Sequence, residues 1–195
     1  MLRLFVPLLA AAALLTGCLP QSKNPIAPPS QTFADRRLEG VWEQKADDGS
    51  RSYFHMARRI DRGTPWLDVA DVSHRDENKG LGFDGYTALS AKIGNERFLS
   101  FKNSRLTGSP TPAGTFSFAR YDFTWRGDLR IWLLSEDALA EAVRAGQLHG
   151  KVKGSGFSLD VKLTDSSARL AEFFSSPENV HHFFNDKPMI LRRVR

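Results

Sequence analysis

The sequence of 195 residues contains a single cysteine, Cys18. One thiol cannot close a disulfide within the chain, so a disulfide framework is excluded. The sequence also lacks an uninterrupted apolar segment of about 20 residues, the length that a helix needs to cross roughly 30 Å of hydrocarbon. The apolar run Leu4–Leu15 is shorter than this. We therefore expect no transmembrane helix.

Motifs of the common enzyme classes are also missing. The sequence has no Gly-x-Ser-x-Gly segment and no His-Glu-x-x-His pair. Gly80-Leu81-Gly82-Phe83-Asp84-Gly85 matches the dinucleotide-binding pattern letter for letter, but it follows the charged segment Arg75–Lys79 and leads into a strand-like run. That pattern needs a strand before it and a helix after it, so we expect no nucleotide there and no cofactor. A non-enzymatic protein is favoured.

The charge balance is mildly basic, with 27 Lys and Arg against 22 Asp and Glu. Basic residues come in pairs, at Arg36-Arg37, Arg58-Arg59 and Arg192-Arg193, and acidic residues interrupt them. Nucleic-acid binding needs a denser basic stripe, so we expect no nucleic-acid partner. The pairs are typical of solvated strand faces, with attraction to anionic lipid or polysaccharide as the alternative.

The densest group of potential metal ligands comprises Asp68, Asp71, His74 and Asp76. In an extended chain Asp68, His74 and Asp76 share one face, so a metal site is conceivable. Such a run is more typical of the polar side and outgoing turn of a strand. We therefore predict no metal.

The first residues follow the order of a secretory signal, with a positive start at Met1–Arg3 and then the apolar run. The run ends in Leu15-Thr16-Gly17-Cys18, which resembles the lipobox of bacterial lipoproteins. The resemblance implies that residues 1–17 are a signal peptide, removed before Cys18, and that the Cys18 thiol carries a diacylglyceryl group. An ordinary secretory signal with an incidental cysteine is the alternative.

Acyl chains on Cys18 would anchor the protein, because each buried CH₂ contributes about 0.8 kcal/mol. Leu19-Pro20 follows the cysteine, without the Asp that retains such lipoproteins at the inner membrane of Gram-negative bacteria. By this resemblance we expect an outer-membrane lipoprotein of the cell envelope that faces the periplasm.

Residues 18–35 are rich in Pro, Ser, Gln and Asn and contain few large apolar residues. Such a composition buries too little surface to offset chain entropy. We predict a lipidated cysteine followed by a flexible, extended tether.

Residues 36–195 have the size of one domain. Their apolar and polar residues alternate with a period of two, which is typical of strands with one face in a core. Turn formers such as Arg126-Gly127-Asp128 separate the segments. We predict a mainly β domain with strands at Leu38–Gln44, Ser52–Ile60, Trp66–Ser73, Tyr86–Ile93, Arg97–Lys102, Thr115–Trp125, Leu129–Ser135, Phe157–Leu163 and Met189–Val194.

The segment Thr115–Trp125 carries aromatic residues on both faces. Phe116 and Phe118 face one way, whereas Tyr121, Phe123 and Trp125 face the other. This pattern predicts a strand that is covered on both sides or bent by a bulge midway.

Two segments depart from the period of two. Ser135 precedes Glu136-Asp137 as a helix cap, and Gly146 ends a short helix. A longer C-terminal helix is expected from Thr164 or Asp165 to a stop before Pro177, and a further turn carries Val180, Phe183 and Phe184.

Many short antiparallel strands, a late helix and a final strand are the order expected of a closed barrel. Gly40 and Trp42 form a Gly-x-Trp motif that resembles the opening of lipocalin-like barrels. The resemblance implies that Trp42 closes one end of the barrel and that an arginine of the last strand, Arg192 or Arg193, lies over it. A guanidinium can stack on indole while it donates hydrogen bonds to carbonyl groups.

Small barrels either fill with side chains or enclose one ligand. The 14 Phe and four Trp suit both arrangements. Our leading hypothesis is a membrane-anchored, lipocalin-like protein that binds a hydrophobic or amphipathic small molecule, such as a lipid. The alternative is a filled barrel that acts as a protein-interaction or scaffold module toward an envelope partner, and an enzyme ranks third.

Overall fold

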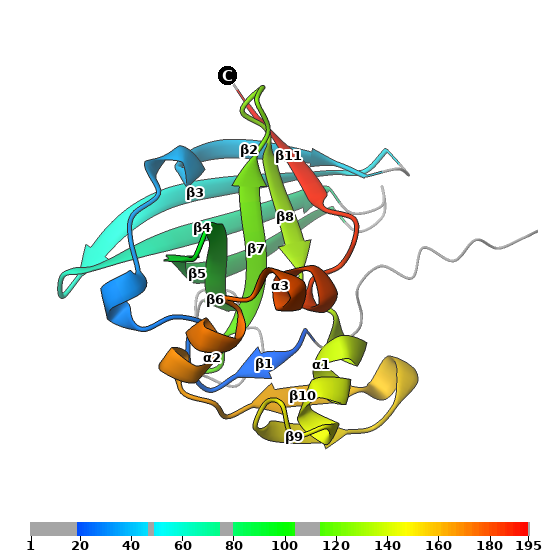
Figure 1. The fold of residues 1–195 in the computed structure, drawn as a ribbon. Helices are drawn as coiled ribbons and strands as arrows, with labels where there is room; N and C mark the ends of the chain where they lie inside the picture. Colours follow the sequence, from blue (N-terminus) through cyan, green and yellow to red (C-terminus); the bar gives the residue numbers. More distant parts are fainter. Residues whose placement is uncertain (1–18, 47–48, 75–79, 104–113, 195) are drawn as a thin grey trace, which may run out of the picture.

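The computed structural model describes residues 19–46, 49–74, 80–103 and 114–194 (Figure 1). In these ranges the strands and helices are β1 (Gln21–Ser22), β2 (Gly40–Lys45), β3 (Arg51–Asp61), β4 (Thr64–His74), β5 (Leu81–Ile93), β6 (Glu96–Asn103), β7 (Ser117–Phe123), β8 (Leu129–Leu133), α1 (Glu136–Arg144), β9 (Gly150–Lys153), β10 (Asp160–Leu163), α2 (Ser167–Phe173), α3 (Pro177–Phe183) and β11 (Met189–Arg193).

Eight of these strands form a closed barrel in the order β11-β2-β3-β4-β5-β6-β7-β8. All neighbours are antiparallel, and β11 closes the ring because it pairs with both β2 and β8. The predicted mainly β fold with an antiparallel barrel is therefore confirmed.

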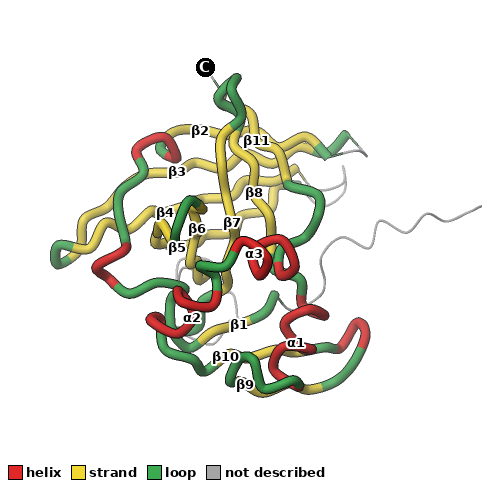
Figure 2. The backbone as a smooth tube through the Cα atoms, in the orientation of Figure 1, coloured by secondary structure: helices red, strands yellow, loops and turns green. Residues whose placement is uncertain are grey.

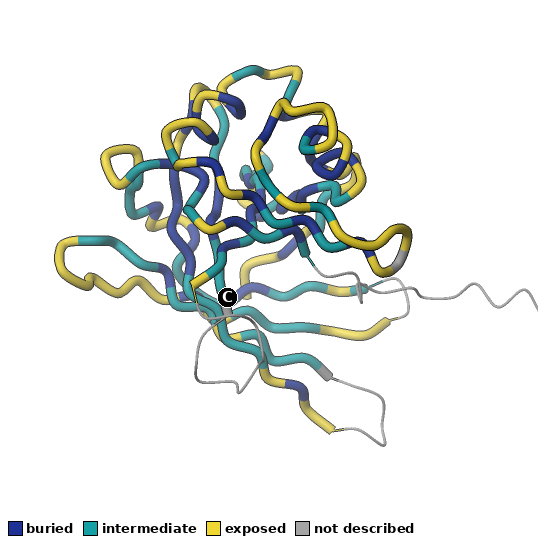
Figure 3. The backbone as a smooth tube through the Cα atoms, turned by 90° about the horizontal axis from the view of Figure 1, so that it is seen from below, coloured by how far each residue is buried: buried dark blue, intermediate teal, exposed yellow. Residues whose placement is uncertain are grey.

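The hairpin between β3 and β4 has a two-residue turn in which Arg62 (φ 48°) and Gly63 (φ 78°) both have positive φ. This turn geometry matches the right-handed twist of paired strands. The hairpin tip is exposed (Figure 3).

Two separate hydrophobic cores lie on the two sides of the barrel wall. The inner core fills part of the barrel, and the outer core joins one side of the wall to the helices and to a three-stranded sheet with the order β1-β10-β9 (Figure 2). In β7, Phe118 belongs to the outer core, while Ala119 and Tyr121 belong to the inner one. The expectation of a strand covered on both sides is thus confirmed for β7, whereas Trp125 lies beyond the strand and is 88% exposed.

The N-terminal segment is not the flexible tether that we predicted for residues 18–35. From Gln21 onward it packs on the domain, since β1 pairs in parallel with β10 and Ile26 is fully buried in the outer core. The Ile26 N–H donates to Ser100 Oγ at 2.9 Å, and Asn24 Nδ2 donates to the Asp165 carbonyl at 2.8 Å. The prediction failed because a few specific contacts with distant residues outweigh the polar composition.

The helical prediction is correct for α1, where the Ser135 side chain accepts a hydrogen bond from the Ala138 N–H. The predicted helix that stops before Pro177 is present as α2, and the predicted further turn is α3. Only the predicted length of the first is wrong, because α2 has seven residues and is shorter than the nine-residue α1. Proline has no N–H to continue the first helix and disfavours helical geometry in the residue before it.

The last internal strand also differs from the prediction. Phe157–Leu163 reduces to the short β10, and β9, which was not predicted, pairs with it outside the barrel. The residues of both cores that the structure describes all lie after Leu19, so a fragment of residues 19–195 keeps every one of them.

Candidate ligand-binding site

One end of the barrel is packed around Trp42, which is fully buried. The Trp42 Nε1–H donates to the Leu38 carbonyl at 2.8 Å, and the buried Leu38 belongs to a short 3-10 helix, Arg36–Leu38. Phe123 lies beside the indole with ring centroids 6.1 Å apart. This end of the barrel is therefore closed by side chains and by the chain that enters β2.

The arginine over Trp42 is Arg193. Its guanidinium carbon lies 4.4 Å from the centroid of the indole ring. Its Nη1 donates to the Glu39 carbonyl at 2.7 Å, and its Nη2 donates to the Arg37 carbonyl at 2.5 Å. Arg192 lies opposite Glu43 in the register, so it points to the other face of the strand.

Gly40 explains why the motif needs a glycine at its first position. Its φ of 126° lies in a region that other residues rarely adopt, and a Cβ atom built on it would lie 2.6 Å from Arg193 Nη1. The structure therefore brings Gly40, Trp42 and Arg193 together, and leaves Arg192 outside the group.

Sequence reasoning missed a buried carboxylate at this end. Asp35 accepts hydrogen bonds from Arg37 Nη2 at 2.6 Å and from the Tyr121 hydroxyl at 3.1 Å. Burial alone would raise the pKa of Asp35, but the hydrogen bonds and charge of Arg37, together with the Tyr121 hydroxyl, hold the pKa below its usual value. The pKa of Tyr121 is raised by burial and by the Asp35 charge. This carboxylate is fully partnered and stabilises the closed end.

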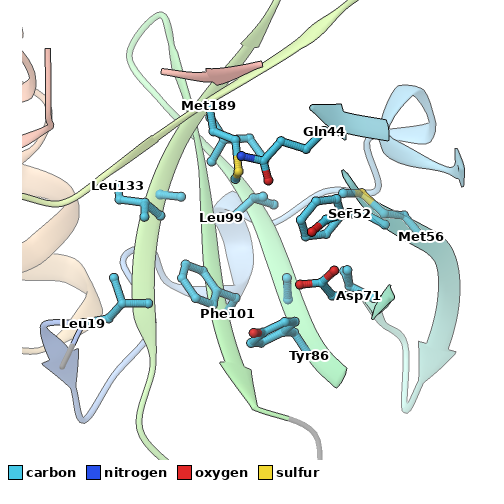
Figure 4. Close-up of a pocket in the computed structure, with 15 residues that line it drawn as sticks. Leu19, Gln44, Ser52, Met56, Asp71, Tyr86, Leu99, Phe101, Leu133 and Met189 are labelled. Carbon is cyan, nitrogen blue, oxygen red and sulfur yellow. The ribbon is translucent and has the colours of Figure 1, made fainter. Parts of the chain in front are cut away.

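Beyond the closed end the barrel is hollow. A cavity of about 270 Å³ lies toward the end where β2 stops and β3 starts (Figure 4). Trp42, Tyr121 and Leu129 do not line it, so the barrel is packed at one end and open inside at the other. Most of the lining residues are apolar or aromatic. The full lining comprises Leu19, Gln44, Ser52, Phe54, Met56, Val69, Asp71, Tyr86, Ala88, Leu99, Phe101, Ala119, Ile131, Leu133 and Met189.

Asp71 is the acidic residue of this lining. It lies on β4, on the inward face shared with Leu67 and Val69, and Figure 4 shows its carboxylate pointing into the cavity near Tyr86. Its Oδ1 atom is buried and has no hydrogen-bond partner among the described residues. Burial, and then the charge of Asp84 on the neighbouring strand, raises the pKa of Asp71 to about 6.

Tyr86 borders the carboxylate from β5. Burial, followed by the charges of Asp84 and Asp71, raises the pKa of its hydroxyl to about 12. The Tyr86 ring meets the Phe101 ring edge-on, with centroids 6.2 Å apart. The cavity thus combines a mostly apolar wall with a few polar groups, the general composition of small-molecule sites.

The residues considered as metal ligands do not form a centre in the part of the chain that the structure describes. Asp68 faces outward and pairs with Arg59 at 2.8 Å, whereas Asp71 faces inward. Asp76 lies outside the described residues, and the described ranges contain no group of three potential ligands.

The dinucleotide-like segment Gly80–Gly85 leads into the long strand β5, so the helix that would bind a pyrophosphate does not follow it. Residues 1–18, which include the predicted signal peptide and Cys18, lie outside the described residues. In the remaining chain, none of the described helices combines the length and hydropathy needed to span a membrane.

Comparison with known proteins finds no matching family model, no similar curated protein and no similar solved structure.

Proposed function

We propose that this protein is a lipid-anchored protein of the bacterial cell envelope whose lipocalin-like barrel binds a small hydrophobic or amphipathic molecule. The observation that carries the proposal is the cavity of about 270 Å³ inside the barrel. Ligand sites commonly have volumes of roughly 300–1,000 Å³ and predominantly apolar walls with a few polar groups. A cavity near the lower limit favours a small ligand or a single chain over a bulky one.

The closed end supports the lipocalin-like interpretation. Gly40, Trp42 and Arg193 lie together as the resemblance implies, and the arginine side chain spans the first and last strands. A rigid end of this kind keeps one side of the cavity sealed, so a ligand would enter from the other end.

The start of the chain relates the proposed anchor to the cavity. Leu19 lines the cavity, and Cys18 is the residue immediately before it, about 3.8 Å away along the backbone. Because the chain packs on the domain from Gln21, no long spacer separates the two. A diacylglyceryl group on Cys18 would therefore emerge beside the cavity, which would let a ligand pass between the bilayer and the barrel.

Fluorescence titration of residues 19–195 with an uncharged, environment-sensitive naphthalene probe tests the binding proposal. We expect saturable binding near one probe per chain, with a micromolar Kd. Ala88→Leu adds bulk inside the cavity and should weaken binding at least about tenfold. Ala70→Leu makes the same change on the exposed outer face of the neighbouring strand, opposite His55 and Gly85, and should leave binding unchanged.

Absence of saturable binding, or equal binding by both variants, would remove the ligand proposal. The envelope scaffold module would then be the better hypothesis, since Phe83 and Leu81 are 62% and 51% exposed on the outer face of β5 and could contact a protein partner.

A further inference from the structure

The carboxyl group of Asp71 destabilises the folded barrel. A carboxyl group in an apolar cavity loses hydration, and an unpaired buried polar atom costs free energy of folding. Its Oδ1 atom has no partner among the described residues, and no ion pair compensates its charge there. An apolar residue at this position would fit the wall formed by Val69 and Met56 better.

Three other aspartates among the described residues are each paired with an arginine. Asp35 binds Arg37 at 2.6 Å, Asp122 binds Arg130 at 2.6 Å, and Asp68 binds Arg59 at 2.8 Å. Asp71 differs from them because it has no arginine partner in the described ranges and because it faces a cavity. An uncompensated carboxylate aimed into a pocket is a candidate for ligand recognition.

The surroundings of Asp71 favour a positive partner. Asp84 is its direct neighbour across the β4–β5 pairing, so two carboxylates lie side by side. Aromatic rings of Tyr86, Phe101 and Phe54 line the same cavity, and ring faces attract cations. The described lining contains no Lys, Arg or His that could neutralise an anionic headgroup.

We propose that the cavity selects a small hydrophobic amine, whose ammonium group binds the Asp71 carboxylate and whose apolar part lies against Leu99, Ile131 and Leu133. This inference rests on the proposed function, because it names the ligand class for the same cavity. β8 stands opposite β4 in the eight-stranded ring, so Leu133 faces Asp71 across the cavity and the ligand would span its width (Figure 4).

The main competing ligands differ in the charge of one group. A carboxylate such as a fatty acid would be repelled by Asp71 and Asp84. An alcohol could accept or donate one hydrogen bond but would gain no charge attraction, whereas an ammonium forms a charge-assisted bond of about twice the strength. A matched series of equal chain length therefore separates the three.

Displacement of the naphthalene probe from residues 19–195 by octylamine, octanol and octanoate tests the inference at pH 8, where Asp71 is ionised. We expect octylamine to displace the probe at a concentration at least tenfold below that of octanol, and octanoate to be the weakest. Asp71→Asn should remove the preference for the amine while octanol displaces as before. Asp68→Asn, on the outer face of the same strand, should keep the preference.

Titration to pH 5 provides a second readout. The titratable described groups facing Asp71 are Asp84 and Tyr86 from β5, and β2, β3, β6, β7, β8 and β11 present uncharged side chains to the cavity. Protonation of Asp71 near pH 6 should reduce the preference for octylamine at least threefold, and this change should be absent in Asp71→Asn.

The outcomes separate the two proposals. If octanol or octanoate displaces the probe as well as octylamine does, or if Asp71→Asn keeps the amine preference, the amine inference is wrong while ligand binding stands. If the probe itself does not bind saturably, the proposed function fails and the amine inference fails with it.

Discussion

The guanidinium of Arg193 lies 4.4 Å from the centroid of the Trp42 ring and thereby joins the last strand of the barrel to the first. The same side chain donates hydrogen bonds to the carbonyls of Arg37 and Glu39, in the segment that crosses the closed end. One residue thus holds the ring of strands and its cover together.

Arg193→Ala should lower the free energy of unfolding by about 1–3 kcal/mol, because it removes a cation–π contact and two hydrogen bonds. Arg192→Ala changes the adjacent, outward-facing arginine and should cost less than about 0.5 kcal/mol. Urea denaturation of both variants measures the difference. A larger cost for Arg192→Ala would contradict the assigned role of Arg193.

Gly40→Ala should also destabilise the fold, by about 1–3 kcal/mol, through its positive φ and its contact with Arg193 Nη1. Gly127→Ala is the matched control, since Gly127 has a φ of 87° but open space around it. When Arg193 is also replaced by Ala, the loss in free energy of unfolding caused by Gly40→Ala should fall toward the loss caused by Gly127→Ala. An unchanged loss would mean that Arg193 is not what Gly40 accommodates.

Much of the barrel could be predicted from the sequence because its strands are marked by patterns within short segments of the chain. Alternation with a period of two located the barrel strands, and the Gly-x-Trp motif with the terminal arginines located the closed end. The packed N-terminal segment could not be found in this way, since Ile26 is held by Ser100, 74 residues away. Composition averages over such specific contacts.

The position of Asp71 in a cavity could not be predicted from the sequence for a different reason. The sequence analysis grouped Asp71 with nearby acidic residues as a candidate metal ligand. Asp71 lies, however, an even number of positions from Leu67 and Val69 along the strand, so it shares their inward face. A charged residue on the apolar face of a strand was the available signal. The cavity beside it depends on how eight strands close, which no local pattern specifies.

Asp71 should make stability depend on pH. Its pKa is raised from 3.8 to about 6 in the folded protein, so the folded state binds the proton more tightly than the unfolded state. Its contribution to stability is therefore fully present below about pH 4 and is lost as the pH rises through 6.

Asp71→Asn should accordingly raise the free energy of unfolding at pH 8 by about 1–3 kcal/mol and change it little at pH 4. Asp68→Asn, which loses an exposed ion pair with Arg59, should lower it by less than about 1 kcal/mol at pH 8. Denaturation at the two pH values checks both. A destabilised Asp71→Asn at pH 8 would mean that the carboxylate has a partner within the protein.

Cys18→Ser removes the only thiol and should leave an uncut precursor or a soluble product without lipid mass. Thr16→Ala keeps a small residue before the cysteine and should be processed as the unaltered chain is. Cell fractionation and intact-mass measurement distinguish the products. A Cys18→Ser variant that fractionates with membranes as the unaltered protein does would exclude the lipid anchor.

Native mass spectrometry of the protein purified from the membranes of the cells that make it tests ligand binding in the cavity most directly. We expect one additional small-molecule mass per chain, present in Ala70→Leu and lost in Ala88→Leu. A chain with no such additional mass, or an equal additional mass in both variants, would contradict a ligand in the barrel.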